Sequence, residues 1–233
     1  MSNIVEIAGM SKGYGLSKTV FQDLNLNLES GKIIGLLGPN GSGKTTLIKT
    51  LAGLLRQDSG KVLIDGKDIG PETKAVVSYL PERTYFNEYM KVRDLVNMFH
   101  DFYEDFDEER AYHMMELLSI DSNIILKKLS KGNKEKVQLI MVMSRRAKLY
   151  LLDEPIAGVD PAARDYILET ILTNYDDKAT ILISTHLIQD IENILDEVIF
   201  IKEGQIVCHQ DADSLRQQKG QSIDEIFREV FRC

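Results

Sequence analysis

Hydrophobic residues are spaced in two ways along this chain, and each spacing predicts its own kind of element. Short apolar runs, some of them alternating with polar residues, predict β-strands at residues 4–8, 20–28, 33–37, 62–64 and 76–80. Helical spacing begins at residues 45–55 and returns near the carboxyl end, where helices at 162–174 and 187–195 alternate with strands at 150–153, 180–184 and 197–201. Strands that alternate with helices predict a largely parallel sheet that is covered on both faces.

Residues 84–147 break this pattern, because strand signals vanish there. Helical spacing at 92–103, 108–118 and 130–146 predicts an inserted helical subdomain. Farther on, Gly204 marks a turn between two short strands, and an amphipathic helix near residues 223–231 closes the chain. We therefore expect one α/β domain, 1–233, with a core from residues 1–83 and 148–233 and the helical subdomain at 84–147.

The bulk properties exclude some classes of function. A formal charge of −8 argues against a nucleic-acid binder, because neutralising phosphates requires a basic surface. The sequence has no uninterrupted apolar stretch of the roughly 20 residues that cross a bilayer as a helix, so a membrane role would depend on a partner. The two cysteines, Cys208 and Cys233, show no metal-type pairing, and the first residues do not resemble a signal peptide. Both observations fit a reducing cytosol.

A glycine-rich loop between the apolar strand 33–37 and the following helix is the first candidate for chemistry. It matches the P-loop pattern with the run Gly38-Pro39-Asn40-Gly41-Ser42-Gly43-Lys44-Thr45. Glycines let backbone N–H groups turn toward phosphates, the helix N-terminus adds a favourable dipole, Lys44 supplies a cation and Thr45 can bind Mg²⁺. The expected phosphate-site residues are Gly38, Pro39, Asn40, Gly41, Ser42, Gly43, Lys44, Thr45 and Thr46.

Two carboxylates end the apolar strand 150–153, in the position of a Walker B segment. Asp153 is the expected Mg²⁺ residue, and Glu154 directly after it can face the γ-phosphate and polarise the attacking water. A positioned general base contributes about 10²–10⁴ in rate. A P-loop and a Walker B segment alone leave kinases, GTPases, helicases and motor proteins open.

Later segments resemble the ABC ATPase family, and the resemblance covers essentially the whole chain. A long predicted helix opens at Leu129-Ser130-Lys131-Gly132-Asn133, which is similar to the family signature Leu-Ser-Gly-Gly-Gln. The family D-loop resembles Pro155-Ile156-Ala157-Gly158-Val159-Asp160, and its switch histidine matches the last residue of Ser184-Thr185-His186. The resemblance implies a P-loop NTPase fold with a parallel-sheet core, an antiparallel β subdomain and an inserted helical subdomain.

The same resemblance implies roles for residues outside the P-loop. Tyr14 would stack on adenine, although a lone Tyr is more often structural. His186 would hold the γ-phosphate and orient Glu154; its alternative is a solvent-facing histidine at a helix start. Ser130 and Gly132 would complete the ATP site of a facing subunit, and Asp160 would contribute from the D-loop. Two ATP molecules would then join a head-to-tail dimer, which hydrolysis reopens.

Two departures from the family pattern limit this transfer. Lys131 and Asn133 replace a Gly and the Gln of the signature, which adds a positive charge. Glu82, in Leu-Pro-Glu, stands where the family has the Q-loop Gln; its carboxylate could approach Mg²⁺ or a water but cannot donate a hydrogen bond when ionised. Both departures resemble a subgroup that serves export systems with separately encoded membrane subunits.

The resemblance therefore implies a transport ATPase that uses ATP and Mg²⁺ at the cytoplasmic face of the membrane. Its expected partners are a separately encoded permease and a second ATPase subunit, identical or related, and no nucleic acid. Apolar residues near Glu82 could face the permease or pack in the core: Leu80, Tyr85, Phe86, Tyr89 and Met90. ABC ATPases that act on nucleic acid or ribosomes generally need a coiled-coil insertion or tandem cassettes, which are absent. An inactive regulatory binder predicts loss of groups such as Lys44 and Glu154, which are present.

Overall fold

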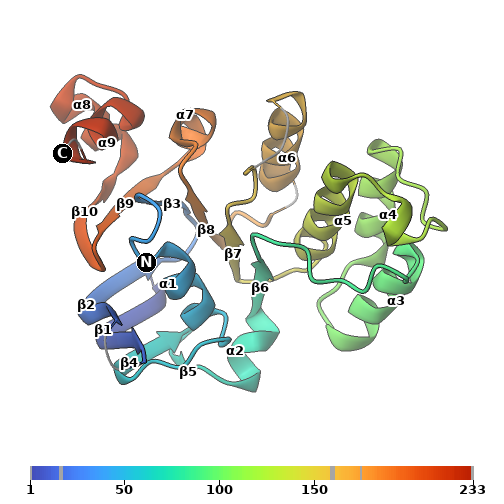
Figure 1. Cartoon of the computed structure of the whole chain (residues 1–233), viewed down its shortest axis with the longest axis horizontal. Coiled ribbons are helices and arrows are strands. Elements are labelled where there is room, and N and C mark those ends of the chain that lie inside the picture. The colour runs from blue at the N-terminus through green and yellow to red at the C-terminus, as the bar shows by residue number, and fades with distance from the viewer. Residues whose placement is uncertain (1, 16–17, 158–160, 174, 232–233) are drawn as a thin grey trace.

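A six-stranded sheet forms the centre of the molecule (Figure 1). The computed structural model describes residues 2–15, 18–157, 161–173 and 175–231. The sheet order is β10-β9-β3-β8-β7-β6, with all neighbours parallel except β10, which runs antiparallel to β9. Its strands are Ile33–Leu37 (β3), Val77–Leu80 (β6), Leu149–Asp153 (β7), Thr180–Thr185 (β8), Glu197–Lys202 (β9) and Gln205–Asp211 (β10). The predicted largely parallel sheet is confirmed.

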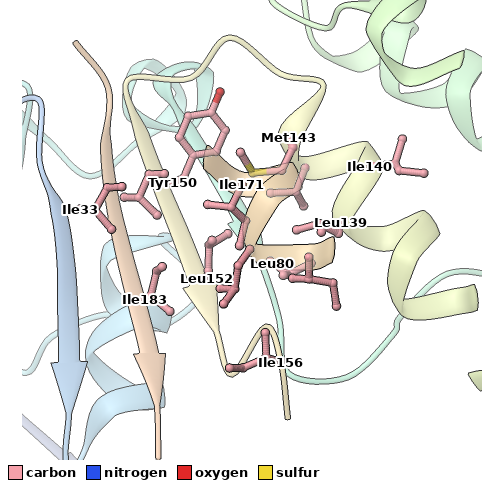
Figure 2. Close-up of a cluster of buried hydrophobic side chains, with 14 of the residues drawn as sticks. Ile33, Leu80, Leu139, Ile140, Met143, Tyr150, Leu152, Ile156, Ile171 and Ile183 are labelled. Carbon is pink, nitrogen blue, oxygen red and sulfur yellow. The ribbon is translucent and has the colours of Figure 1, made fainter. Parts of the chain in front are cut away.

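The central strands are continuous apolar runs because both of their faces are covered. On β3, Ile33 joins one core while the neighbouring Ile34 joins the other, and on β7 Leu152 and Leu151 divide in the same way. Figure 2 shows strand residues of the first core opposite side chains of the helix Lys131–Met143 (α5). The sheet therefore separates two hydrophobic layers.

A second, antiparallel sheet packs on one of these layers. It has the order β2-β1-β4-β5, with strands Asn3–Tyr14 (β1), Lys18–Glu29 (β2), Ser59–Ile64 (β4) and Lys67–Asp68 (β5). Its buried face shares a core with the helix Lys44–Leu51 (α1) and with β3. This is the antiparallel β unit that the family resemblance implied.

Three longer helices lie beyond the β6 edge of the central sheet (Figure 1). They are Val92–Phe102 (α3), Glu108–Leu117 (α4) and α5, with a 3-10 turn at Leu126–Lys128 (η1). Side-chain caps fix two starts: Asp107 accepts from the N–H of Arg110 at α4, and Ser130 accepts from the N–H of Asn133 at α5. Residues 84–147 thus contain the predicted helices.

The remaining helices cover the sheet and close the chain. They are Pro71–Val76 (α2), Pro161–Thr173 (α6), Ile188–Ile191 (α7) with the 3-10 turn Glu192–Ile194 (η2), Ala212–Lys219 (α8) and Ile223–Phe231 (α9). Within the described ranges, no helix combines the length and the apolar character needed to span a bilayer.

Several predicted boundaries were wrong, and each has a local cause. The first helix ends at Leu51 rather than near residue 55, because Gly53 adopts a positive φ of 69° that ends a helix. The helix predicted over 187–195 is broken into α7 and η2 at Ile191, whose φ of −114° departs from the helical value. The short helix α8 was missed because it buries only Ala212 and Leu215.

Candidate functional site

A cleft opens at the carboxyl ends of β3, β7 and β8, the usual binding edge of a parallel sheet. Its volume is about 390 Å³. Most of the side chains selected from the sequence come together there, although they are far apart along the chain. The cleft is lined by Tyr14, Val20, Asn40, Gly41, Gly43, Lys44, Thr45, Thr46, Glu82, Glu154, Ala157 and His186.

The loop between β3 and α1 needs glycine where other parts of the fold approach it. A Cβ at Gly38 would lie 2.4 Å from the carbonyl oxygen of Ile201, and one at Gly43 would lie 2.7 Å from Cζ of Phe21. Gly43 also has a φ of 115°, which L side chains rarely adopt. The α1 start has no side-chain cap and no acidic residue in its first turn, so the helix N-terminus is suited to an anion.

Lys44 is held inside this loop as a buried cation. Its Nζ donates to the carbonyl of Gly38 at 2.7 Å and lies 3.9 Å from Oε1 of Glu154. Only 6% of Lys44 is exposed, and burial lowers its pKa, while the negative charges of Glu154, Asp153 and Glu82 oppose that change. A positive group is therefore fixed where phosphate oxygens would enter.

Asp153 lies beneath the cleft at the end of β7. Its Oδ1 accepts hydrogen bonds from the hydroxyls of Thr45, at 3.1 Å, and Ser184, at 2.7 Å. Burial raises the pKa of Asp153, and those two hydrogen bonds oppose the rise. The contribution of Ser184 was missed at the sequence level; its only signal was its place beside His186 at the end of a predicted strand.

The second oxygen of Asp153 bears on whether Mg²⁺ fits here. Oδ2 is buried and has no hydrogen-bond partner among the described residues. It belongs to the same carboxylate whose Oδ1 accepts from the Thr45 hydroxyl. No group of three or more His, Cys, Asp or Glu residues in the described ranges could hold a metal by itself. This arrangement fits Mg²⁺, which proteins often bind through one or two carboxylates together with substrate phosphates.

Glu154 and His186 form a hydrogen-bonded pair at the mouth of the cleft. Glu154 Oε2 lies 3.0 Å from Nδ1 of His186, whose side chain is half exposed. Glu154 has a φ of 53°, an unusual conformation for a residue with a side chain. Its backbone N–H donates to both the carbonyl and the hydroxyl of Ser184, which stabilises that conformation. The fold thus aims this carboxylate across the cleft.

Tyr14, at the end of β1, and Glu82, just after β6, also line the cleft. Tyr14 ends β1, is 43% exposed and places its hydroxyl 3.3 Å from that of Thr46. An exposed ring beside the phosphate loop has room for a base to stack on it. Glu82 follows β6 and is exposed, and Gln138 of α5 donates to the carbonyl of the preceding Pro81 at 3.1 Å. Glu82 therefore lies between the cleft and the helical region.

Ser130 and Gly132 do not join the other predicted site residues. Among the described residues, none from α5 lines the cleft. Ser130 is exposed, and a Cβ at Gly132 would meet nothing within 4 Å, so this helix start faces open space. Asp160, also predicted for the site, lies outside the described residues. Gly38, Pro39 and Ser42 belong to the same loop as the lining residues Gly41 and Gly43 but do not themselves line the cleft. The Ser42 hydroxyl is buried without a hydrogen-bond partner in the described structure.

Comparisons with known proteins place this geometry in a family context. The family model described as "ABC transporter" matches residues 21–157. The "ABC transporter ATP-binding protein YtrB" of Bacillus subtilis (strain 168) is 31% identical over 218 residues, which span 92% of this chain and 74% of the relative. The "SkfA peptide export ATP-binding protein SkfE" of the same organism is 30% identical over 88% of this chain and 87% of the relative.

Solved structures agree with these sequence relatives. One described as "Structure of ATP binding subunit of ABC transporter" superposes with a TM-score of 0.87 and 28% identity. The match covers 98% of this chain and all of that chain. A nucleotide-free ATP-binding cassette from an ABC transporter matches with a TM-score of 0.75 at 22% identity, which concerns the fold alone.

Proposed function

This chain belongs to the ABC transporter family, as an ATP-binding subunit that hydrolyses ATP to power transport, and we propose that Glu154 is its general base. The observation that carries this assignment is the 3.0 Å contact between Glu154 and His186, which aims the carboxylate across the cleft. An attacking water between Glu154 and the γ-phosphate would give up its proton to this carboxylate. His186 would orient Glu154 and contact the γ-phosphate.

The phosphate end of ATP is held by the loop before α1. Backbone N–H groups of residues 38–46, apart from Pro39, which has none, would surround the phosphates, and Lys44 would neutralise part of their charge. Asp153 and Thr45 would hold a Mg²⁺ ion, which supplies further charge neutralisation at the phosphates. Glu82 would face that ion or one of its waters as an acceptor only, because an ionised carboxylate donates no hydrogen bond. Tyr14 would stack on the adenine.

The exposed start of α5 supports a shared site between two ATPase subunits. Ser130 and Gly132 lie outside the cleft of their own chain, yet they form an accessible helix N-terminus of the kind that binds anions. They would contact the γ-phosphate held by a second subunit, identical or related, with Asp160 contributing at the same interface. ATP binding would close this dimer and hydrolysis would reopen it.

A groove beside the helical region supports docking of a separately encoded transmembrane permease at the cytoplasmic face of the membrane. Its volume is about 520 Å³, and it is lined by β6, the neighbouring helices and the side chain of Tyr85. Tyr85 is 59% exposed and suits a partner contact, whereas Leu80 is buried and belongs to the core. The peptide-export relative favours outward transport. The helical segment 84–147 would move with the permease.

Replacing Glu154 with Gln tests the assignment most directly. Glu154→Gln should lower turnover about 10²–10⁴-fold, the usual contribution of a positioned base, while ATP still binds. Light scattering on a sizing column should then show a dimer with Mg²⁺-ATP and a monomer without it. Glu229→Gln, which changes an exposed carboxylate outside the cleft, should behave like the unaltered chain.

The outcomes separate the two parts of the proposal. Hydrolysis by Glu154→Gln at the unaltered rate would contradict the role of Glu154. Loss of hydrolysis with a persistent monomer would leave that role intact and contradict pairing of identical chains.

A further inference from the structure

A second cavity is lined by several cationic side chains. It lies at the amino ends of the central strands, whereas the ATP cleft lies at their carboxyl ends. The volume of the second cavity is about 360 Å³, and its lining includes Arg110, Arg146, Lys148, Lys178, Tyr175 and Asp176. Lys148 directly precedes β7 and Lys178 lies just before β8, whereas the ATP cleft lies where those two strands end. The two cavities therefore occupy opposite ends of the same strands.

The charges around this second cavity differ from those of the chain as a whole. The chain carries a formal charge of −8, yet among the described residues that line the cavity there are four cations and only one carboxylate, Asp176. These cations come from α4, from the segment between α5 and β7, and from the segment before β8. The fold brings them together although their positions are distant in the sequence.

Acidic partners hold two of these cations in place without lining the cavity. Arg146 pairs with Asp107 at 2.9 Å and Lys148 with Asp65 at 2.7 Å. The side chains of Arg146 and Lys148 are 70% and 58% exposed, and exposed ion pairs of this kind contribute only about 0–1 kcal/mol. Arg146 and Lys148 can therefore contact a more highly charged anion in addition to, or in place of, their carboxylate partners. Arg110 lies 3.9 Å from Asp107 and is less exposed.

We propose that this cavity binds a phosphate-bearing anion. Guanidinium groups present N–H donors in a planar fork that matches phosphate, and lysines add point charges. Tyr175, which also lines the cavity, carries a hydroxyl that is able to donate a hydrogen bond. The cavity is nearly as large as the 390 Å³ ATP cleft, so it has room for a pyrophosphate-sized group. The site is independent of the proposed roles of Glu154, Ser130 and the groove.

Calorimetric titration with inorganic pyrophosphate at low ionic strength tests the site. The titration uses a Lys44→Ala background, so that the P-loop contributes less binding. Adding Lys148→Gln and Lys178→Gln together should weaken binding at least about tenfold, because two attractive charges are lost. The control adds Lys61→Gln and Lys219→Gln, which remove the same charge at exposed positions outside the cavity and should change affinity less than about twofold.

The source of the phosphate is tested with vesicles. The same variants are sedimented with phosphatidylcholine vesicles that contain or lack phosphatidic acid. If the protein sediments with the vesicles only when phosphatidic acid and both cavity lysines are present, the ligand is a lipid headgroup. If pyrophosphate binds but the protein does not sediment with these vesicles, the ligand is a free anion. The proposal is overturned if neither pyrophosphate nor vesicle binding depends on Lys148 and Lys178. ATP hydrolysis and melting temperature of the cavity variant, measured without the Lys44 change, check that it folds.

Discussion

Two helices of this chain begin at positions suited to an anion, but they are built differently. The α1 start carries the buried Lys44, has no side-chain cap and opens into the cleft of its own chain. The α5 start is exposed, and Ser130 caps it by accepting from the N–H of Asn133. Desolvation strengthens electrostatic interactions at the first site, whereas the second stays in water until something covers it. One chain therefore contains a deep half and an open half of the proposed ATP site.

Arg145 connects the regions that carry these two halves. Its guanidinium pairs with Asp105 beside α4 at 2.9 Å and donates to the carbonyls of Ala75, in α2, and Val77, at the start of β6. It also lies 3.9 Å from the ring centroid of Tyr103, and only 2% of Arg145 is exposed. This contact fixes the helical region against the edge of the central sheet.

Removing that connection should give the largest change. Arg145→Met keeps the length of the side chain but leaves Asp105 and two carbonyls without their donor. Breaking a buried ion pair in this way costs up to about 3–5 kcal/mol, and the 24% exposure of the Asp105 side chain places this pair toward the lower value. The free energy of unfolding from urea titration would report the loss. Arg146→Met is the matched control, because Arg146 is 70% exposed and its pair should contribute at most about 1 kcal/mol. Equal decreases in the free energy of unfolding for the two variants would show that Arg145 does not hold the regions together.

A bulky cation at the open half should affect assembly and leave the deep half intact. Ser130→Arg places a long side chain where a second subunit would approach, so the Mg²⁺-ATP-dependent dimer of the Glu154→Gln chain should weaken at least about tenfold. Nucleotide binding to the single chain, followed by fluorescence of an ATP analogue, should change less than about twofold. Gln217→Arg adds the same charge on the exposed face of α8 and serves as the control. An undiminished dimer would place the interface elsewhere.

The sequence predicted the deep half far better than the connections around it. The strand 33–37 was predicted to the residue, because a strand buried on both faces is a continuous apolar run. Lys44, Glu154 and His186 line one cleft because each follows a strand of the same parallel sheet. The Arg145 contacts could not be predicted, since its partners are spread from Ala75 to Asp105 and nothing in the local sequence distinguishes it from Arg146. The cationic cavity likewise exists only after folding.

The smallest expected change in stability concerns the buried carboxylate inside the deep half. Asp153 is 1% exposed, and one of its oxygens has no partner among the described residues. Asp153→Asn keeps an acceptor for the Thr45 and Ser184 hydroxyls while it removes the buried charge. The nucleotide-free chain should therefore become more stable by about 1 kcal/mol at neutral pH, because a neutral amide avoids the desolvation cost of a buried carboxylate. The same variant should lose Mg²⁺-dependent hydrolysis.

The pH dependence identifies the cause of that gain. Burial raises the pKa of Asp153 in the folded chain above its value in the unfolded chain. The folded state therefore binds the proton more tightly, and the associated stability is fully present below the unfolded pKa, about 3.9, and is lost as pH rises through the folded pKa. The advantage of Asp153→Asn over the unaltered chain should consequently grow from acidic to neutral pH, measured as the difference in urea unfolding midpoints. Glu229→Asn, an exposed change, should show no such growth. A gain that is the same at every pH would mean that packing, and not the buried charge, limits the stability of this site.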